Sequence, residues 1–415
     1  MDPANLHNNN TTTSSRRDNK TSSFPQRPVA QLLGSNGPIH AVSYSASPGS
    51  YILTGSADRS IRLYNPLPEK NNTTLNNGGS SYITTPSSAA AAVGIPSGLL
   101  IQTYSGHGYE VLSLAIAADN ARFASAGGDR AVYLWDVVTA QTVRRFGATS
   151  GQGHSGRVNA VAFAGSDDSL LVSGGLDTTV RIWDTKSGGN GAKPIQVLGD
   201  AKDAVTSLAV SGDAEVIAGS VDGRVRSYDV RMGRVVADVF PASVTSLCLS
   251  RDEKTLLVGS LDSKLRLMDR RDGKCLRTYA DKGWRNEELR VQSVFGGGER
   301  FVVAGDELTA SSVSSGADDG DDVSGGGGGG GLTEGRIWAW DLLTGKLVAK
   351  ISLSWNNNNN NTTTGVGTGI PPLGGYRKDK NKNKNVVSSL AWKEGGFGNQ
   401  FCVGGTSGVV TVFGE

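Results

Sequence analysis

The chain has 415 residues, of which 57 are glycine, and its 41 basic and 39 acidic side chains leave a formal net charge of +2. A balance so close to neutral excludes a global field that draws the whole chain to nucleic acid or to a membrane surface. No run of about 18 apolar residues is present, which excludes a conventional membrane-spanning helix. The widely spaced Cys248, Cys275 and Cys402 favour neither a disulfide framework nor a zinc site, so we expect a soluble protein of a reducing, intracellular compartment.

The first segment of the chain, residues 1–27, is rich in Asn, Thr and Ser and lacks the apolar core of a secretory signal. We expect this segment to be a disordered tail. The rest of the chain, residues 28–415, carries an internal repeat that begins with the apolar stretch 29–33.

Each repeat contains an acidic turn residue, then a short alternating strand that ends in Asp or Asn. The turn residue and the terminal residue lie seven positions apart in six copies: Asp58/Asn65, Asp129/Asp136, Asp177/Asp184, Asp222/Asp229, Asp262/Asp269 and Glu334/Asp341. A seventh copy, Ser407/Gly414, is degenerate. Apolar residues within these strands alternate with period two, as in a strand with one buried face. With the flanking apolar stretches, each repeat predicts four short strands, which must stack on neighbouring repeats to bury both faces.

Three intervals between terminal residues exceed the ~40–45-residue period of such repeats by about 30 residues. The excess falls in polar, low-complexity stretches near residues 67–97, 308–333 and 355–385. Such sequences cannot bury enough apolar surface to fold by themselves, so we expect flexible insertions. Because the last repeat ends after its third strand, residues 29–33 are predicted to supply the missing fourth strand. A seven-bladed propeller would then be closed non-covalently by the two ends of the chain.

Two of the repeats contain His, Ser, Asp and Trp at nearly matching offsets: His107/Ser125/Asp129/Trp135 and His154/Ser173/Asp177/Trp183. A Ser-His-Asp set can form a nucleophile, base and orienting acid. Here the set occurs twice in corresponding places, with the serine inside a strand rather than on an exposed turn. We therefore interpret both sets as structural tetrads that link strands through hydrogen bonds. With four histidines in the chain, no metal-ligand cluster is expected, and we predict no catalytic or cofactor-binding residue.

Several dipeptides resemble the signature of WD40 repeats: Trp135-Asp136, Trp183-Asp184 and Trp340-Asp341, together with Gly106-His107 and Gly153-His154. This resemblance covers residues 29–413 apart from the insertions, and it implies an all-β, seven-bladed WD40 propeller. The stretches Gly108-Tyr109-Glu110-Val111 and Arg231-Met232-Gly233 are not general WD40 features, and they are similar to the mitogen-activated protein kinase organizer 1 family. That similarity implies a non-catalytic scaffold for MAP kinase cascade modules and for pre-mRNA splicing (spliceosomal) complexes.

By analogy with such propellers, the turn before each third strand and the start of each first strand lie on one rim. The second and third insertions would flank this rim around blades six and seven, and the first would hang from the opposite face. Partner contacts are then expected over blades two to five. The candidates are Tyr109, Glu110, Arg130, Arg157, Arg224 and Lys264, with Trp284 and Arg285 near the edge of that sector. Arginines four residues after the turn Asp are expected instead to pack between blades or to form ion pairs: Arg62, Arg181, Arg226 and Arg266.

Two alternatives to a scaffold stay open. The first is a substrate receptor of a cullin-type ubiquitin ligase, whose adaptor box resembles Asp229-Val230-Arg231 and Asp269-Arg270-Arg271. The second, which ranks last, is a propeller hydrolase that uses a Ser-His-Asp set. The expected partners are proteins, either kinase-cascade or splicing components, with no cofactor and no direct contact with nucleic acid or membrane. We expect a monomer within larger complexes, located in both the cytoplasm and the nucleus.

Overall fold

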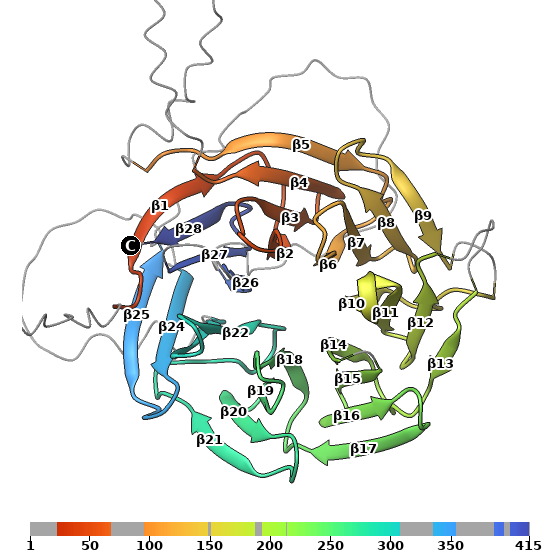
Figure 1. Ribbon diagram of the computed structural model, residues 1–415. Coiled ribbons are helices and arrows are strands. Elements are labelled where there is room, and N and C mark those ends of the chain that lie inside the picture. Colours follow the sequence, from red (N-terminus) through yellow and green to blue (C-terminus); the bar gives the residue numbers. More distant parts are fainter. Residues whose placement is uncertain are drawn as a thin grey trace, which may run out of the picture.

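The computed structural model of the chain describes residues 23–67, 95–147, 151–186, 193–212, 214–307, 335–353, 386–393 and 399–414. Within these ranges the chain forms strands β1 to β28 and one short 3-10 turn, Ser166–Asp168. The strands group into seven antiparallel sheets of four strands each. The sheets stand as blades around a common centre (Figure 1). This arrangement confirms the all-β, seven-bladed propeller predicted from the repeat.

In blades one to six, the first strand in sequence lies innermost and the fourth lies outermost (Figure 1). Blade one comprises β2 (Ile39–Tyr44), β3 (Ile52–Ser56), β4 (Ser60–Asn65) and β5 (Leu99–Ser105). Blade two comprises β6 (Val111–Ile116), β7 (Arg122–Gly127), β8 (Val132–Asp136) and β9 (Thr142–Phe146). Blade three comprises β10 (Val158–Ala164), β11 (Leu170–Gly175), β12 (Val180–Asp184) and β13 (Gln196–Leu198). Blade four comprises β14 (Val205–Ser211), β15 (Glu215–Ser220), β16 (Arg224–Asp229) and β17 (Arg234–Val239).

The remaining three blades follow the same plan, with one exception at the end of the ring. Blade five comprises β18 (Val244–Leu249), β19 (Thr255–Ser260), β20 (Lys264–Asp269) and β21 (Cys275–Tyr279). Blade six comprises β22 (Ser293–Gly296), β23 (Phe301–Gly305), β24 (Gly335–Asp341) and β25 (Leu347–Leu353). Blade seven comprises β26 (Val387–Trp392), β27 (Gln400–Gly405), β28 (Val410–Gly414) and, as its outermost strand, β1 (Arg27–Leu32).

The ring is closed by the pairing of β1 with β28, in which Ala30 lies opposite Val412 and Leu32 lies opposite Val410. The predicted closure by residues 29–33 is therefore confirmed. The segment before β5 adds to the closure, because the Gln31 N–H donates to the Pro96 carbonyl (2.9 Å) and Ser97 forms a parallel bridge with Gln31. The first insertion was predicted to run to residue 97, and this end was wrong, since Ser97 is tied to the closing strand. The bulk of that insertion and the predicted insertions 308–333 and 355–385 lie outside the described residues.

The hydrophobic core is divided into seven clusters, and each cluster lies between two neighbouring blades. Between blades seven and one, for example, Cys402 and Val412 pack with Ile39 and Tyr64. Each single sheet exposes apolar side chains on both faces, so it becomes stable only when a blade covers it on each side. The closed ring leaves no blade with an uncovered face.

The small-residue stretch at the end of each second strand has a steric cause. A Cβ added to Gly127 would lie 1.9 Å from the Glu110 carbonyl oxygen, and one added to Gly405 would lie 1.8 Å from the Val386 carbonyl oxygen. These contacts occur where the innermost strand bulges against the second strand, as between Val111 and Ser113. Glycine is required at these two positions because no side chain fits between the backbones.

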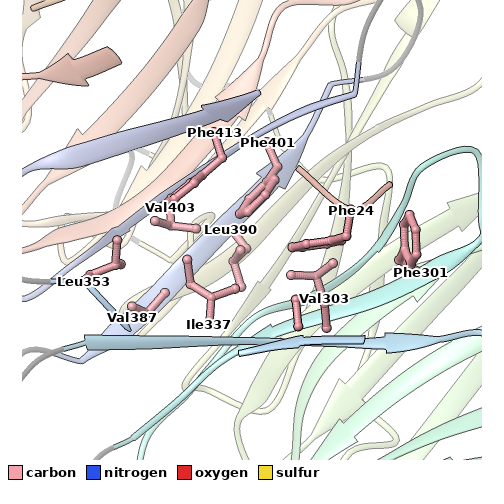
Figure 2. Packing of buried hydrophobic residues seen from close by; sticks show 12 residues of the cluster. Phe24, Phe301, Val303, Ile337, Leu353, Val387, Leu390, Phe401, Val403 and Phe413 are labelled. Carbon is pink, nitrogen blue, oxygen red and sulfur yellow. The ribbon is translucent and has the colours of Figure 1, made fainter. Parts of the chain in front are cut away.

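Phe24 contradicts the prediction that residues 1–27 form a disordered tail. Its side chain is 4% exposed and lies in the cluster between blades six and seven (Figure 2). Its ring centroid is 5.3 Å from that of Phe301 and 5.4 Å from that of Phe401. The tail prediction is therefore wrong from Phe24 onward, because one aromatic side chain finds an apolar pocket that composition alone does not reveal; residues 1–22 lie outside the described part of the chain.

Candidate functional site

The two tetrads are continuous chains of hydrogen bonds within blades two and three. In blade two, the Trp135 indole N–H donates to the Ser125 hydroxyl (2.8 Å), Ser125 Oγ lies 2.7 Å from His107 Nε2, and His107 Nδ1 contacts Asp129. In blade three, Trp183 bonds Ser173 (2.8 Å), Ser173 Oγ lies 2.8 Å from His154 Nε2, and His154 Nδ1 lies 2.8 Å from Asp177. Every polar atom is satisfied when each hydroxyl donates to Nε2 and each Nδ1–H donates to a carboxylate.

Burial decides what these tetrads can do chemically. Ser125 and Ser173 are both 0% exposed, so no substrate can reach either hydroxyl. Burial raises the pKa of Asp177, but the hydrogen bond and charge of His154 and the Ser155 N–H outweigh it, so the pKa lies well below its usual range. A fully satisfied buried network of this kind fixes the two strands of the hairpin and the loop before the blade.

Arginine replaces histidine in blades one, four and five. Arg226 in β16 forms an ion pair with Asp222 (2.7 Å) and donates to the Ser220 hydroxyl (2.9 Å). Equivalent pairs join Arg62 to Asp58 (2.7 Å) and Arg266 to Asp262 (2.5 Å), and in blade three Arg181 lies 3.7 Å from Asp177. These arginines were expected to pack between blades or to form ion pairs. The structure shows ion pairs within their own hairpins. An arginine four residues after the turn aspartate lies on the third strand, where its guanidinium reaches back to the turn carboxylate.

Most of the predicted partner-contact residues lie on one face of the disc. We call this face the rim face; it carries the turns between second and third strands and the residues that precede each innermost strand. Tyr109, Arg130, Arg157 and Lys264 are exposed there, with Tyr109 at 64%. The partly exposed members are Glu110, Arg224 and Arg285: Glu110 lies 3.6 Å from His40, and Arg285 forms an ion pair with Glu287 (2.7 Å). The strands that border segments 308–334 and 354–385, which lie outside the described residues, end on the same face.

Trp284 does not belong to this set, and its predicted exposure was wrong. The side chain is 1% exposed and lies in the core between blades five and six. Its indole N–H donates to the Gly305 carbonyl (2.7 Å), and its ring meets that of Trp340 edge-on at 5.4 Å. A buried tryptophan stabilises the fold through the large apolar area that its ring removes from water. Trp284 therefore has a structural role and is not part of the exposed surface.

Blade six replaces the tetrad by two buried carboxylates that the sequence reasoning missed. Asp306 accepts the Trp338 indole N–H (3.1 Å), and burial raises the pKa of this carboxyl despite that bond. Glu307 accepts the backbone N–H groups of Glu287, Glu288 and Leu289 at 2.7, 2.9 and 3.2 Å. The sequence signal is the pair Asp306-Glu307 directly after an apolar strand. Its effect is to fix the loop that leads into β22.

A cavity of about 330 Å³ lies at the mouth of the central channel on the rim face. It is lined by residues on either side of the first buried residue of the innermost strands, such as Glu110 and Leu112 around Val111, and Arg157 and Asn159 around Val158. Period-two alternation explains this pattern, since it directs neighbours of a core residue to the channel. Arg290, directly before the buried Val291, stands at the position that Arg157 has before Val158, and it was not among the predicted residues.

Two kinds of site are missing from the described ranges. They contain no group of three or more His, Cys, Asp or Glu side chains placed to hold a metal ion. They also contain no helix that is long and apolar enough to cross a membrane.

The closed ring of four-stranded blades, with Trp-Ser-His-Asp chains in two of them, defines a WD40 β-propeller. The sequence model described as "WD domain, G-beta repeat" matches residues 26–65, 98–136, 147–184, 192–229 and 236–269, which fall in the first five repeats. Each match from residue 98 onward starts close to the outermost strand of one blade and ends with the third strand of the next. The sequence repeat is therefore offset by one strand from the structural blade.

The particular family follows from comparison with known proteins. WD repeat domain-containing protein 83 of Rattus norvegicus is 34% identical over 337 residues, covering 81% of this chain and 86% of the rat protein. The protein of the same name from Homo sapiens is 36% identical over 324 residues, covering 78% and 82%. A homolog of it in Dictyostelium discoideum is 26% identical over 348 residues, covering 77% and 87%. This chain belongs to the family of WD repeat domain-containing protein 83, for which mitogen-activated protein kinase organizer 1 is another name.

Proposed function

We propose that this chain is a non-catalytic scaffold that assembles protein complexes, with MAP kinase cascade modules, pre-mRNA splicing components or both as its partners. The proposal rests on the contrast between buried side chains that could catalyse a reaction and exposed side chains that could bind a protein. The Ser-His-Asp sets are buried, with both hydroxyls 0% exposed, whereas Tyr109, Arg130 and Lys264 stand open on the rim face. Aromatic and arginine side chains on a rigid, exposed surface suit protein recognition.

The choice of partners rests on the family. The resemblance in Gly108–Val111 and Arg231–Gly233 implies kinase-cascade and splicing complexes, and partners of these two kinds favour a location in both the cytoplasm and the nucleus. A rigid ring that presents residues from several blades on one face can hold two partners side by side without any reaction of its own.

A substrate receptor of a cullin-type ubiquitin ligase is the second candidate. The turn after β16 lies at the opposite end of that strand from Asp222, and therefore on the face opposite the rim face. There Arg231 lines a cavity of about 250 Å³ between blades three and four. Asp229, however, accepts the N–H groups of Arg231 (3.0 Å) and Met232 (2.9 Å), a turn-capping role that Asp136 and Asp341 also have with Thr139 and Thr344. The aspartate of this box is thus explained by turn structure.

Proximity labelling in the native cell tests the proposal. We expect kinase-cascade or splicing proteins with the wild-type chain, and their loss with the double variant Tyr109→Ala/Arg130→Ala. Val138→Ala is the matched control, since Val138 is 84% exposed in the turn after β8, on the opposite face. Thermal unfolding of all variants checks that each still folds.

The outcome separates the candidates. Recovery of a cullin adaptor that disappears with Arg231→Ala supports the ligase receptor instead. If neither kinase-cascade nor splicing proteins are enriched, or if the Val138→Ala control loses them as fully as the rim variant, the scaffold proposal in this form is wrong.

A further inference from the structure

Arg290 crosses the mouth of the central channel. It leads into β22 of blade six, and its Nη1 donates to the Asn159 carbonyl on β10 of blade three (2.8 Å). The Nε of Arg290 is buried without a hydrogen-bond partner, and no carboxylate of the described residues forms an ion pair with it. Burial, followed by repulsion from Arg157, lowers the pKa of Arg290 to about 10. Arg290 as a whole is half-buried and lines the cavity, so its guanidinium is a half-buried cation that has no carboxylate partner among the described residues.

The arginines of the hairpins in blades one, four and five do not share that condition. Arg62, Arg226 and Arg266 each have an aspartate within 2.7 Å. A buried charge without a partner is strongly unfavourable, and proteins usually pair it or replace it by an apolar side chain. The described residues give Arg290 no carboxylate partner, so its charge remains available to an anion from outside the chain.

The walls of the cavity around Arg290 favour a negatively charged ligand. Arg157 is a second guanidinium in the lining, while Glu110, the carboxylate there, lies 3.6 Å from His40. The pKa of His40 is lowered by burial, against the charge of Glu110, and further by Arg290 and Arg157. With His40 neutral, two positive charges face one negative charge. The amide oxygen of Gln292 accepts the Leu390 N–H (3.0 Å), and its NH2 group is a donor that suits an anionic ligand.

We propose that the channel mouth is an oxyanion-binding site, in which Arg290 and Arg157 hold a carboxylate or phosphate group that a protein segment presents to the rim face. Planar guanidinium groups suit both anions because they offer paired N–H donors to two oxygens. The cavity of about 330 Å³ holds one such side chain rather than a folded element. The inference deepens the scaffold function and rests on it only in assigning the anion to a protein partner, since the site itself can be measured without any partner.

The test is anion-linked thermal unfolding at pH 7 and constant ionic strength, with inorganic phosphate or acetate compared against sodium chloride. A ligand that binds the folded state raises Tm with concentration. We expect phosphate, acetate or both to raise the Tm of the wild type above the chloride reference. A larger increment with phosphate indicates a phosphorylated side chain as the source, and a larger one with acetate indicates an acidic side chain. Either result supports the site.

Three variants decide which residues bind. Arg290→Met should remove the increment, with the apparent Kd weakened roughly tenfold or more by loss of a charged hydrogen bond. Arg157→Gln should reduce it. Arg277→Gln is the matched control, because Arg277 lies on the outer strand β21, where it bonds the Thr344 carbonyl (3.0 Å), and its increment should equal that of the wild type.

A second readout separates binding from packing. In chloride alone, Arg290→Met should unfold at the same Tm as the wild type or above it, since the change removes a half-buried charge that has no ion-pair partner. The proposal is overturned if no anion raises the Tm of the wild type above chloride, or if Arg290→Met keeps the increment. It is equally overturned if that variant unfolds at a lower Tm in chloride while its anion increment stays intact, since Arg290 then has a packing role only. These outcomes are independent of the labelling experiment, so the site and the scaffold function can fail separately.

Discussion

Replacing Ser125 by alanine measures how much the hydrogen bonds of the blade-two tetrad contribute to stability. The hydroxyl accepts the Trp135 indole N–H at 2.8 Å and lies 2.7 Å from His107 Nε2. Alanine fits the same space but leaves both groups buried without a partner, because Trp135 is 1% exposed and His107 is 7% exposed. A buried group left unpaired costs about 1–3 kcal/mol. Two such groups would cost about 2–6 kcal/mol. Part of this is recovered because alanine has no hydroxyl that must be dehydrated on folding, so we expect a net loss of about 2–4 kcal/mol in the free energy of unfolding.

Denaturant unfolding followed by tryptophan fluorescence measures this loss, and differential scanning calorimetry gives the accompanying fall in Tm. Each kcal/mol shifts Tm by about 2–4 °C in chains of 150–250 residues and by less in a longer chain. Ser155→Ala is the control, because Ser155 is exposed beside the second tetrad and contributes there through its backbone N–H. Ser173→Ala should repeat the effect in blade three. The two losses should add, since the tetrads share no hydrogen-bond partner.

An unchanged stability of Ser125→Ala refutes the structural interpretation of the tetrad. An ester hydrolysis rate measured in parallel should be the same for the wild type and for Ser125→Ala. If the rate fell to background while stability stayed constant, the serine would be a nucleophile, and the hydrolase hypothesis would return.

Three further predictions concern the ring and its acidic turns. Phe24→Ala should lower the free energy of unfolding by about 3 kcal/mol, near the lower end for buried phenylalanine because the start of the chain can relax, and chemical denaturation against a Phe24→Leu control measures it. Deleting residues 1–33 should remove β1, expose the edge of β28 and cause association that size-exclusion chromatography detects; a monomeric, equally stable product would contradict closure by β1. Because the folded pKa of Asp177 is depressed, its stabilisation is present above its unfolded pKa, about 4, and is lost as pH falls through the folded value. The stability difference between wild type and Asp177→Asn should therefore shrink below pH 4 in acid titrations, and a difference that grows there would refute the assignment.

The repeat register made most of the fold predictable from sequence. The seven-residue distance between turn and terminal residues located six of the third strands, and the unfinished last repeat pointed to residues 29–33 as the closing strand. These features were visible because they are local and recur. The ends of the irregular segments were not, since Ser97 and Phe24 are ordered by contacts with distant strands rather than by their neighbours in sequence.

The site was only partly predictable for a related reason. Tyr109 and Arg157 could be placed on the rim face because their repeats are regular. Trp284 lies in an irregular loop, where the sequence does not show that the core between blades five and six covers it. Arg290 precedes a buried valine, as Arg157 does, and this position could have indicated that it lines the channel. That it has no carboxylate partner can be seen only from distances in the folded structure.

The pairing of β1 with β28 also sets the order of events during synthesis. β1 ends at Leu32, and its partner begins only at Val410. At ~5–20 residues per second, the ribosome needs roughly 20–75 seconds to make the chain between them. Throughout that time the face of blade one that packs against blade seven is uncovered. Ala30 and Leu32, which are apolar, have no partner strand. The nascent protein is therefore an open arc with an uncovered apolar face at each end. Chaperones can bind these faces until β28 leaves the exit tunnel and pairs with β1.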